Sequence, residues 1–167
     1  IVGVERGWLP RDTVARHLLK MVRFLSKADA YHGVFPHWLN GATGKTIAFS
    51  RKDDGADLVE TSFLMQGLLT ARQYFVQDNA DERELRNRIS GHWNDIEWNG
   101  FTRDGQEVLY WHWSPNNGWA MNFAVRGFNE CLIMYVLAAS TPNQQYSVSP
   151  AVYHNGWAQS NFFKNGK

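Results

Sequence analysis

The 167-residue sequence contains one cysteine, Cys131, which excludes an internal disulfide and a zinc site built from several cysteines. No sign of charge predominates, since 17 Lys and Arg stand against 16 Asp and Glu. We therefore expect no nucleic acid partner, because proteins that bind nucleic acid carry a strongly basic face. A run of about 18 apolar residues is also lacking, so we predict no membrane span. The longest apolar stretch, 131–139, is typical of a core segment.

Aromatic residues are abundant, by contrast: eight Trp, ten Phe and six Tyr make up 14% of the chain. Between residues 91 and 119 the tryptophans cluster with Asn, Gly and His, an unusual composition for a plain hydrophobic core. A pyranose has an apolar C–H face and a rim of hydroxyl groups. An aromatic ring packs against the face, and amides, carboxylates and imidazoles bond to the rim. The composition therefore suits a sugar-binding cleft.

The hydrophobic pattern predicts an all-α fold, with helices over 11–31, 54–76, 81–98, 119–139 and from Ser149-Pro150 toward 162. Helices with one apolar face alternate with helices that are apolar almost all round. This order suits a toroid in which one ring of helices surrounds another. Because five helices cannot close such a ring, we expect part of a larger barrel rather than a compact bundle.

Two irregular insertions, 35–49 and 98–113, each join an outer helix to the next buried one. Each is predicted to form two short strands, around a glycine-rich turn in the first and around Asp104-Gly105 in the second. Both insertions should lie on the same rim of the toroid, which is where a cleft would open.

Three carboxylates, Asp53, Asp57 and Glu60, stand at i, i+4 and i+7 near the start of the second predicted helix. Helical geometry places them within an arc of roughly 60°. Capping and helix-dipole roles are the alternative for Asp53 and Asp54. Glu60 lies two turns into an apolar helix, so its carboxylate must be paired or line a cavity.

The helix predicted over 119–139 has few polar side chains, and Asn122, Arg126, Asn129 and Glu130 fall within an arc of about 100°. One interpretation is an ion pair between Arg126 and Glu130 at i, i+4. The other places Glu130 against an apolar wall, where a carboxyl stays protonated and acts as an acid. Carboxylates on two neighbouring inner helices would flank a sugar-sized cleft, as glycoside hydrolysis requires.

Strand alternation within YWHWS (110–114) would place Trp111 and Trp113 on one face and His112 on the other. The Trp pair is either a sugar platform or a cover over the barrel end. The histidines, among them His37, are too scattered for metal-ligand spacing, and no HExxH motif is present. We therefore expect no metal and no cofactor. Cys131, in apolar company, is expected to be inert.

Five segments of the chain resemble the bacterial glucoamylase-like family that includes the endo-β-1,2-glucanases of glycoside hydrolase family 144. They are GVFPHWL (33–39), RKDDGADLVETS (51–62), WNDIEW (93–98), WHWSP (111–115) and GFNEC (127–131). The resemblance covers nearly the whole chain and keeps the order and spacing of the motifs. It implies an (α/α)6 barrel, with residues 1–167 as the N-terminal and central part of a single catalytic domain.

The resemblance also implies an inverting β-glucan hydrolase, most specifically of β-1,2-glucan. Glu130 matches the general acid, Asp57 and Glu60 belong to the catalytic carboxylates, and the base lies beyond residue 167. Substrate contacts are expected from Asp53, Arg51, Trp111, His112, Trp113, Asn122 and Arg126. A secreted or periplasmic bacterial protein follows by the same resemblance, monomeric when complete.

Two alternatives fit the same residues. One is a carbohydrate-binding protein without catalysis, with which the aromatic content is equally compatible. The other is a hydrolase or phosphorylase that acts on a different glucan on the same barrel, which a requirement for phosphate would reveal. A purely structural role is disfavoured, since polar stripes on apolar helices would then destabilise the fold without any compensating gain.

Overall fold

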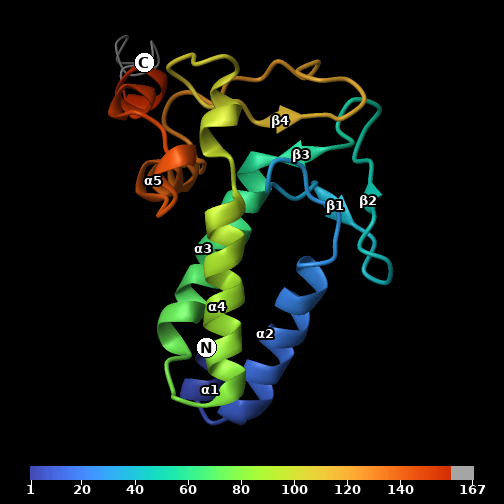
Figure 1. The fold of residues 1–167 in the computed structure, drawn as a ribbon, viewed down its shortest axis with the longest axis vertical. Coiled ribbons are helices and arrows are strands. Elements are labelled where there is room, and N and C mark those ends of the chain that lie inside the picture. Colours follow the sequence, from blue (N-terminus) through green and yellow to red (C-terminus); the bar gives the residue numbers. More distant parts are fainter. Residues whose placement is uncertain (159–167) are drawn as a thin grey trace.

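A computed structural model describes residues 1–158 (Figure 1). Its α-helices are α1 (Val2–Glu5), α2 (Arg11–Leu25), α3 (Leu58–Tyr74), α4 (Ala80–Asp95) and α5 (Leu132–Ser140). Two 3₁₀ helices are η1 (Trp98–Thr102) and η2 (Gln144–Tyr146), and η3 (Val152–Ala158) is a π-helix. Four two-residue strands form two antiparallel pairs, β1 (Trp38–Leu39) with β2 (Thr46–Ile47) and β3 (Ala56–Asp57) with β4 (His112–Trp113). Within 1–158 no helix has the length and apolar character to cross a membrane.

The helices form a layer in which α4 packs against α2 and α3, while α3 also packs against α5. Figure 1 shows α2, α3 and α4 running side by side, with the long connections gathered at one end of the layer. Buried side chains join the helices: Leu19 and Val22 from α2, Leu85 and Ile89 from α4, Met65 from α3. The described helices do not close a ring. The fold is thus a partial toroid with short strand insertions, as the sequence predicted.

The outer helices α2 and α4 begin at or beside the expected residues but end early. Ser26 bonds back to the carbonyl of Val22, which closes the last turn of α2. Asp29 then accepts bonds from the backbone nitrogen of Thr46 and the ammonium group of Lys45. These contacts draw residues 26–31 into the first insertion, and the expectation of helix up to 31 was wrong for that reason.

The inner helix α3 begins at Leu58, not at 54, because the preceding residues are in a strand. The backbone nitrogen of Asp57 donates to the carbonyl of Phe35, and that of Leu58 donates to the carbonyl of Trp111, both at 2.9 Å. Gly55 is needed at this crossing, since an added Cβ would lie 2.4 Å from the carbonyl oxygen of Trp113. The common helical face predicted for Asp53, Asp57 and Glu60 therefore does not exist.

The helix predicted over 119–139 forms only from Leu132. Its first half lies instead along residues 109–111: Trp111 donates to the carbonyl of Phe123, and Val125 donates to that of Leu109. Asn122 and Gly127 have φ values of 47° and 83°, which a right-handed helix does not accommodate. The periodicity of apolar residues was misleading here, because cross-chain backbone bonding competes with a local helix.

The first insertion contains the expected hairpin, β1–β2. In the second, the prediction of a strand pair around Asp104-Gly105 was wrong. Residues 98–102 form the 3₁₀ helix η1, and β4 pairs with β3, which lies in the segment predicted as the start of the second helix. The left-handed turn at Arg103, Asp104 and Gly105 is present. The fifth helix begins at Pro150, as expected, and its predicted part beyond residue 158 lies outside the described residues.

Candidate active site

Asp57 occupies the point where β3 becomes α3, and its carboxylate makes two contacts. Oδ1 accepts from the backbone nitrogen of Glu60 at 2.9 Å, as an N-cap does. Oδ2 lies 2.8 Å from Nδ1 of His37, which comes from the end of the first insertion nearest β1. The side chain of Asp57 is fully buried, whereas that of His37 is 22% exposed. Asp57 is thus fixed in orientation by both bonds, and His37 connects it to the surface.

A cavity of about 280 Å³ opens beside this pair. It is lined by Pro36, His37 and Leu39 from the first insertion and by Glu60, Thr61 and Leu64 from α3. Glu60 is an exposed residue, so its carboxylate stands at the opening. The structure therefore brings two predicted carboxylates to one cavity, Glu60 directly and Asp57 through His37.

Asp53 and His112 lie behind Asp57 and are each only 1% exposed. His112 Nε2 is 3.1 Å from Asp53 Oδ1, an ion-pair separation, but the atoms do not meet the angular requirement of a hydrogen bond. Burial raises the pKa of Asp53 despite the nearby imidazole, and burial lowers the pKa of His112 despite the nearby carboxylates. Both groups are thereby driven toward their neutral forms. Such burial leaves them no direct contact with a ligand, so any part they play in binding passes through Asp57 and His37.

One donor set in residues 1–158 has the composition of a metal site. Donor atoms of His37, Asp53 and Asp57 all lie within 4.8 Å of one another. Imidazole plus carboxylate suits several divalent ions, but a cation would have to replace the hydrogen bond between His37 and Asp57. Sequence spacing did not reveal this group because His37 lies within the first insertion, whereas Asp53 and Asp57 follow it. His37 was missed for the same reason, although it lies in one of the motifs that resemble the glucoamylase-like family.

The Asp54 side chain binds the loop that follows β4. It accepts bonds from Ser114, Asn116 and Asn117. Burial acts to raise the pKa of Asp54, but these three bonds outweigh it and lower the pKa below its ordinary value. Neither capping nor helix-dipole stabilisation explains Asp54, since α3 starts later. Its neighbour Arg51 is exposed.

Glu130 is exposed and lies two residues before α5, so the predicted helical stripe with Asn122, Arg126 and Asn129 was wrong. No ion pair joins Arg126 to Glu130 within the part of the chain that the structure describes. Asn122 instead accepts a bond from Arg103, and the Asn129 side chain accepts from the backbone nitrogen of Cys131. Arg126 and Asn122 are both exposed, and Glu130 lacks the apolar wall expected for it.

The Cys131 thiol nevertheless shows how the predicted carboxylates are arranged. Its pKa is raised to about 11, first by burial and then by the negative charges of Glu130, Asp57 and Glu60. All three carboxylates are thus close enough to act on one thiol at the start of α5. A raised pKa disfavours the thiolate at neutral pH, which agrees with the expectation that Cys131 is inert.

The tryptophans of WHWSP do not form one platform. Trp111 packs edge-on against Phe123, with ring centroids 6.0 Å apart. Trp113 packs instead against His32 and Tyr31, at 4.7 and 6.4 Å. Each ring is partly exposed, and the two have different neighbours.

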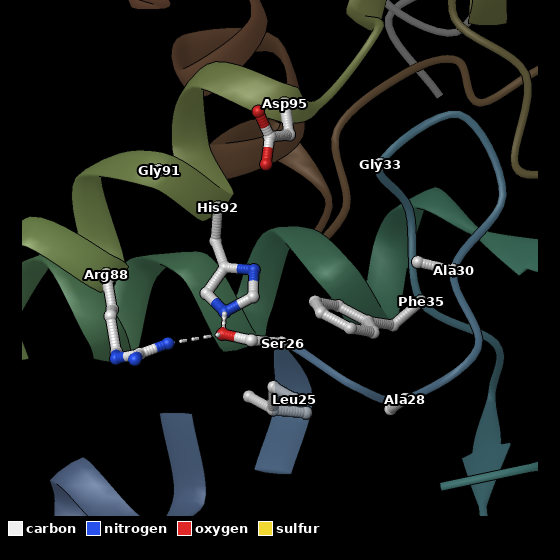
Figure 2. Close-up of a pocket in the computed structure, with 10 residues that line it drawn as sticks. All are labelled: Leu25, Ser26, Ala28, Ala30, Gly33, Phe35, Arg88, Gly91, His92 and Asp95. Atoms are coloured by element: carbon white, nitrogen blue, oxygen red, sulfur yellow. Dashed lines mark hydrogen bonds between the residues drawn. The ribbon is translucent and has the colours of Figure 1, made fainter. Parts of the chain in front are cut away.

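Figure 2 shows another cavity, of about 350 Å³, between the ends of α2 and α4. Ser26, Arg88 and His92 meet there, with the Ser26 hydroxyl 3.3 Å from Nε2 of His92. Burial lowers the pKa of His92. Because none of the predicted site residues lines it, this cavity is not the candidate active site.

No protein-family profile matches the chain. It is 47% identical over 160 residues to the exo β-1,2-glucooligosaccharide sophorohydrolase (non-reducing end) of Parabacteroides distasonis. Among solved structures, it superposes on a candidate glucoamylase from Bacteroides uniformis with a TM-score of 0.92 and 56% identity. It superposes on the endo-β-1,2-glucanase of Chitinophaga pinensis, in complex with sophorotriose and glucose, with a TM-score of 0.90 and 52% identity.

These matches cover nearly all of the chain, 95%, 96% and 95% in turn. The chain spans a much smaller part of the similar proteins: 22% of the sophorohydrolase, 39% of the candidate glucoamylase and 37% of the endoglucanase. The similarity therefore concerns one continuous part of longer proteins.

Proposed function

The chain belongs to the glucoamylase-like family that its motifs resemble, and from this premise we propose that it is part of a glycoside hydrolase that cleaves β-1,2-glucan. One observation carries the proposal. Glu60 and the His37–Asp57 pair meet at one cavity, in a chain about half identical to proteins named for hydrolysis of β-1,2-linked glucose.

In the proposed reaction Glu130 donates a proton to the glycosidic oxygen as the bond to the anomeric carbon breaks. Water attacks that carbon from the opposite side and loses its proton to a base outside residues 1–167. The configuration is then inverted, which requires acid and base to stand about 6.5–9.5 Å apart. The exposed position of Glu130 just before α5 leaves its carboxyl free to reach a sugar.

Glu60 holds the sugar on the near side of the cleft, and Asp57 supports this contact from below. Asp57 is too buried to meet a substrate by itself, but it orients the ring of His37 and the first turn of α3. Glu60, at the cavity opening, accepts hydrogen bonds from sugar hydroxyls. Carboxylates that bind the hydroxyls of a ring also favour its distortion toward the transition state.

Further contacts come from residues exposed on the same connections. Arg51, Asn122 and Arg126 donate hydrogen bonds, and Trp111 offers an aromatic face. Asp53 and His112 act beneath them by holding Asp57. We also propose that residues 1–167 belong to one catalytic domain, in a secreted or periplasmic bacterial protein that is monomeric when complete.

The test is product analysis with the full-length parent protein on β-1,2-, β-1,3-, β-1,4- and α-1,4-glucans. We expect short oligosaccharides from the β-1,2 polymer alone, without phosphate. Glu130→Gln should lower turnover by at least about a hundredfold, the lower end of what general acid catalysis contributes, while substrate affinity is retained. Unchanged turnover in Glu130→Gln would remove Glu130 from the mechanism.

Asn129→Ala is the matched control, since Asn129 is exposed beside Glu130 and, among the described residues, its side chain bonds backbone groups alone. It should keep most of the activity. A second candidate function is carbohydrate binding without catalysis, favoured by the partly exposed tryptophans of the connections. Glucan binding without release of reducing sugar by the wild type would select it.

A further inference from the structure

The β3–β4 ribbon has two faces, and only one of them belongs to the candidate active site. Residues directly opposite in an antiparallel pair share a face, and successive residues alternate. The register pairs Asp57 with His112 and Ala56 with Trp113. Asp57 and His112 therefore point toward the carboxylate cluster, and Trp113 points to the reverse side.

A separate cavity of about 210 Å³ lies on that reverse side. Its aromatic walls are Trp113, Trp119 and Phe101, and its polar groups are His32, Glu97 and Asp104. It shares no lining residue with the cavity beside Glu60. It is also smaller than the roughly 300–1,000 Å³ typical of drug-sized ligands, so it suits one sugar ring rather than a long chain.

The rings that line this cavity are held in place by other aromatic groups. Trp119 packs edge-on against Phe101 and against Tyr110, with centroids 5.9 and 5.8 Å apart. Trp119 remains partly exposed, as does Trp113. A fixed and partly exposed indole is what packing against the C–H face of a sugar requires.

His32 closes one side of the cavity in an unfavourable backbone conformation. Tyr31 and Val34 exchange backbone hydrogen bonds, so His32 and Gly33 form the two central residues of a tight turn, with φ values of 56° and 75°. Asn or Gly is normal at the first of these positions. His32 instead places its ring 4.7 Å from that of Trp113 and its Nδ1 2.9 Å from Glu97. A side chain kept at a conformational cost points to a role in the cavity.

The polar groups decide the class of ligand. Two carboxylates, Glu97 and Asp104, disfavour an anion such as a phosphate and accept hydrogen bonds from hydroxyl groups. Aromatic walls with such acceptors select a neutral polyol with an apolar face. We infer that this cavity is an accessory saccharide site that binds a glucosyl unit of the glucan chain. It lies on the face of the β3–β4 ribbon opposite the carboxylates. The inference rests on the proposed function for the identity of the glucan.

The test compares Trp119→Ala with the wild type in the full-length parent protein. Retention in gels that contain β-1,2-glucan should fall in the variant, and the KM for the polymer should rise about fivefold, as expected from losing one aromatic contact. The kcat/KM for the shortest oligosaccharide that is cleaved should stay unchanged, because that substrate is too short to reach both faces.

Two further variants separate the site from the fold. Trp8→Ala removes a tryptophan that is 73% exposed. Trp8 lies between α1 and α2, at the end of the helical layer away from the β3–β4 ribbon (Figure 1), so this variant should behave as wild type. The double variant Glu97→Gln, Asp104→Asn keeps shape and turn preference but weakens the acceptors, so it should also lose retention. It replaces Trp119→Ala if that variant does not fold.

Equal retention and equal polymer KM in a folded Trp119→Ala protein would overturn the inference while the proposed hydrolysis stands. If the wild type cleaves no β-1,2-glucan, the proposed function fails instead. Retention on the other glucans of the panel that still depends on Trp119 would then support the accessory site, and no retention on any glucan would refute it.

Discussion

Glu82 in the helical layer and Asp53 in the connections are equally buried, each 1% exposed, but their surroundings differ. Glu82 accepts from Nε and Nη2 of Arg11 at 2.8 and 3.0 Å and from the backbone nitrogen of Gln77 at 2.7 Å. Burial acts to raise the pKa of Glu82, but these bonds outweigh it and the pKa is lowered. Within residues 1–158 Asp53 receives no hydrogen bond at either carboxylate oxygen, and its pKa is raised.

The helical layer and the connections differ in the same way over their whole lengths. Every non-glycine residue with positive φ in the described chain lies in the connections: His32, Arg103, Asp104 and Asn122. The helical layer has satisfied ion pairs instead, such as Glu84 between Arg23 and Arg88, which lower its pKa to about 2. The helical layer is built for stability, and strained or unsatisfied groups are concentrated where the candidate sites are.

The largest expected effect on stability comes from the satisfied carboxylate. Arg11→Ala leaves Glu82 buried without its cation and should lower the free energy of unfolding by about 3 kcal/mol. Thermal unfolding of the full-length parent protein measures this as a fall in Tm. Arg23→Ala, at the exposed pair with Glu84, is the control and should change Tm little. An equal fall in both variants would mean that burial does not distinguish the two pairs.

A second prediction concerns pH, and the two carboxylates should respond in opposite directions. Because its pKa is lowered, Glu82 stabilises the fold above its unfolded pKa of about 4.3 and loses this as pH falls. The Tm difference between Arg11→Ala and wild type should therefore shrink from pH 7 to pH 3. Because the pKa of Asp53 is raised, its ionisation destabilises the fold. This destabilisation develops as pH rises above the unfolded pKa of about 3.9. Asp53→Asn should match wild type at pH 3 and equal or exceed its Tm at pH 7.

The smallest effect on stability is expected for that same substitution at neutral pH. Asp53→Asn keeps the shape and removes a poorly compensated charge, so the free energy of unfolding should change by less than about 1 kcal/mol. Hydrolysis should fall, because Asp53 lies against the His37–Asp57 pair. The comparison would break down if Asp53→Asn cost as much stability as Arg11→Ala, since Asp53 would then be a satisfied ion in the native protein.

The sequence was sufficient for the fold class and for the starts of α2 and α4, because helix periodicity is a local property. It failed where distant backbone segments bond to each other. Residues 119–131 carry a helical pattern but bond along 109–111, and β4 pairs with β3 rather than within its own insertion. Local spacing contains no information on such partners.

The same limit applies to the candidate site. Asp57 and Glu60 were found through their position on an apolar helix, although the helical face argued for them does not include Asp53. His37 comes from a segment 20 residues before Asp57 and has no periodic relation to it. Only the fold brings the two together, so a spacing rule for metal ligands or paired groups could not identify it.

The β3–β4 ribbon also has a consequence for how the protein folds. It joins segments far apart in the chain: Ser114 bonds to Asp54 across 60 residues. Closing so long a loop has an entropic cost that is recovered only when the partner segment is already in place. The helical hairpin α3–α4 lies between the two strands and brings their ends together when it packs. Both candidate sites should therefore assemble late, after the helices. Protection of the Leu58 amide, which donates to the carbonyl of Trp111, from hydrogen exchange should develop after that of the Leu85 and Ile89 amides.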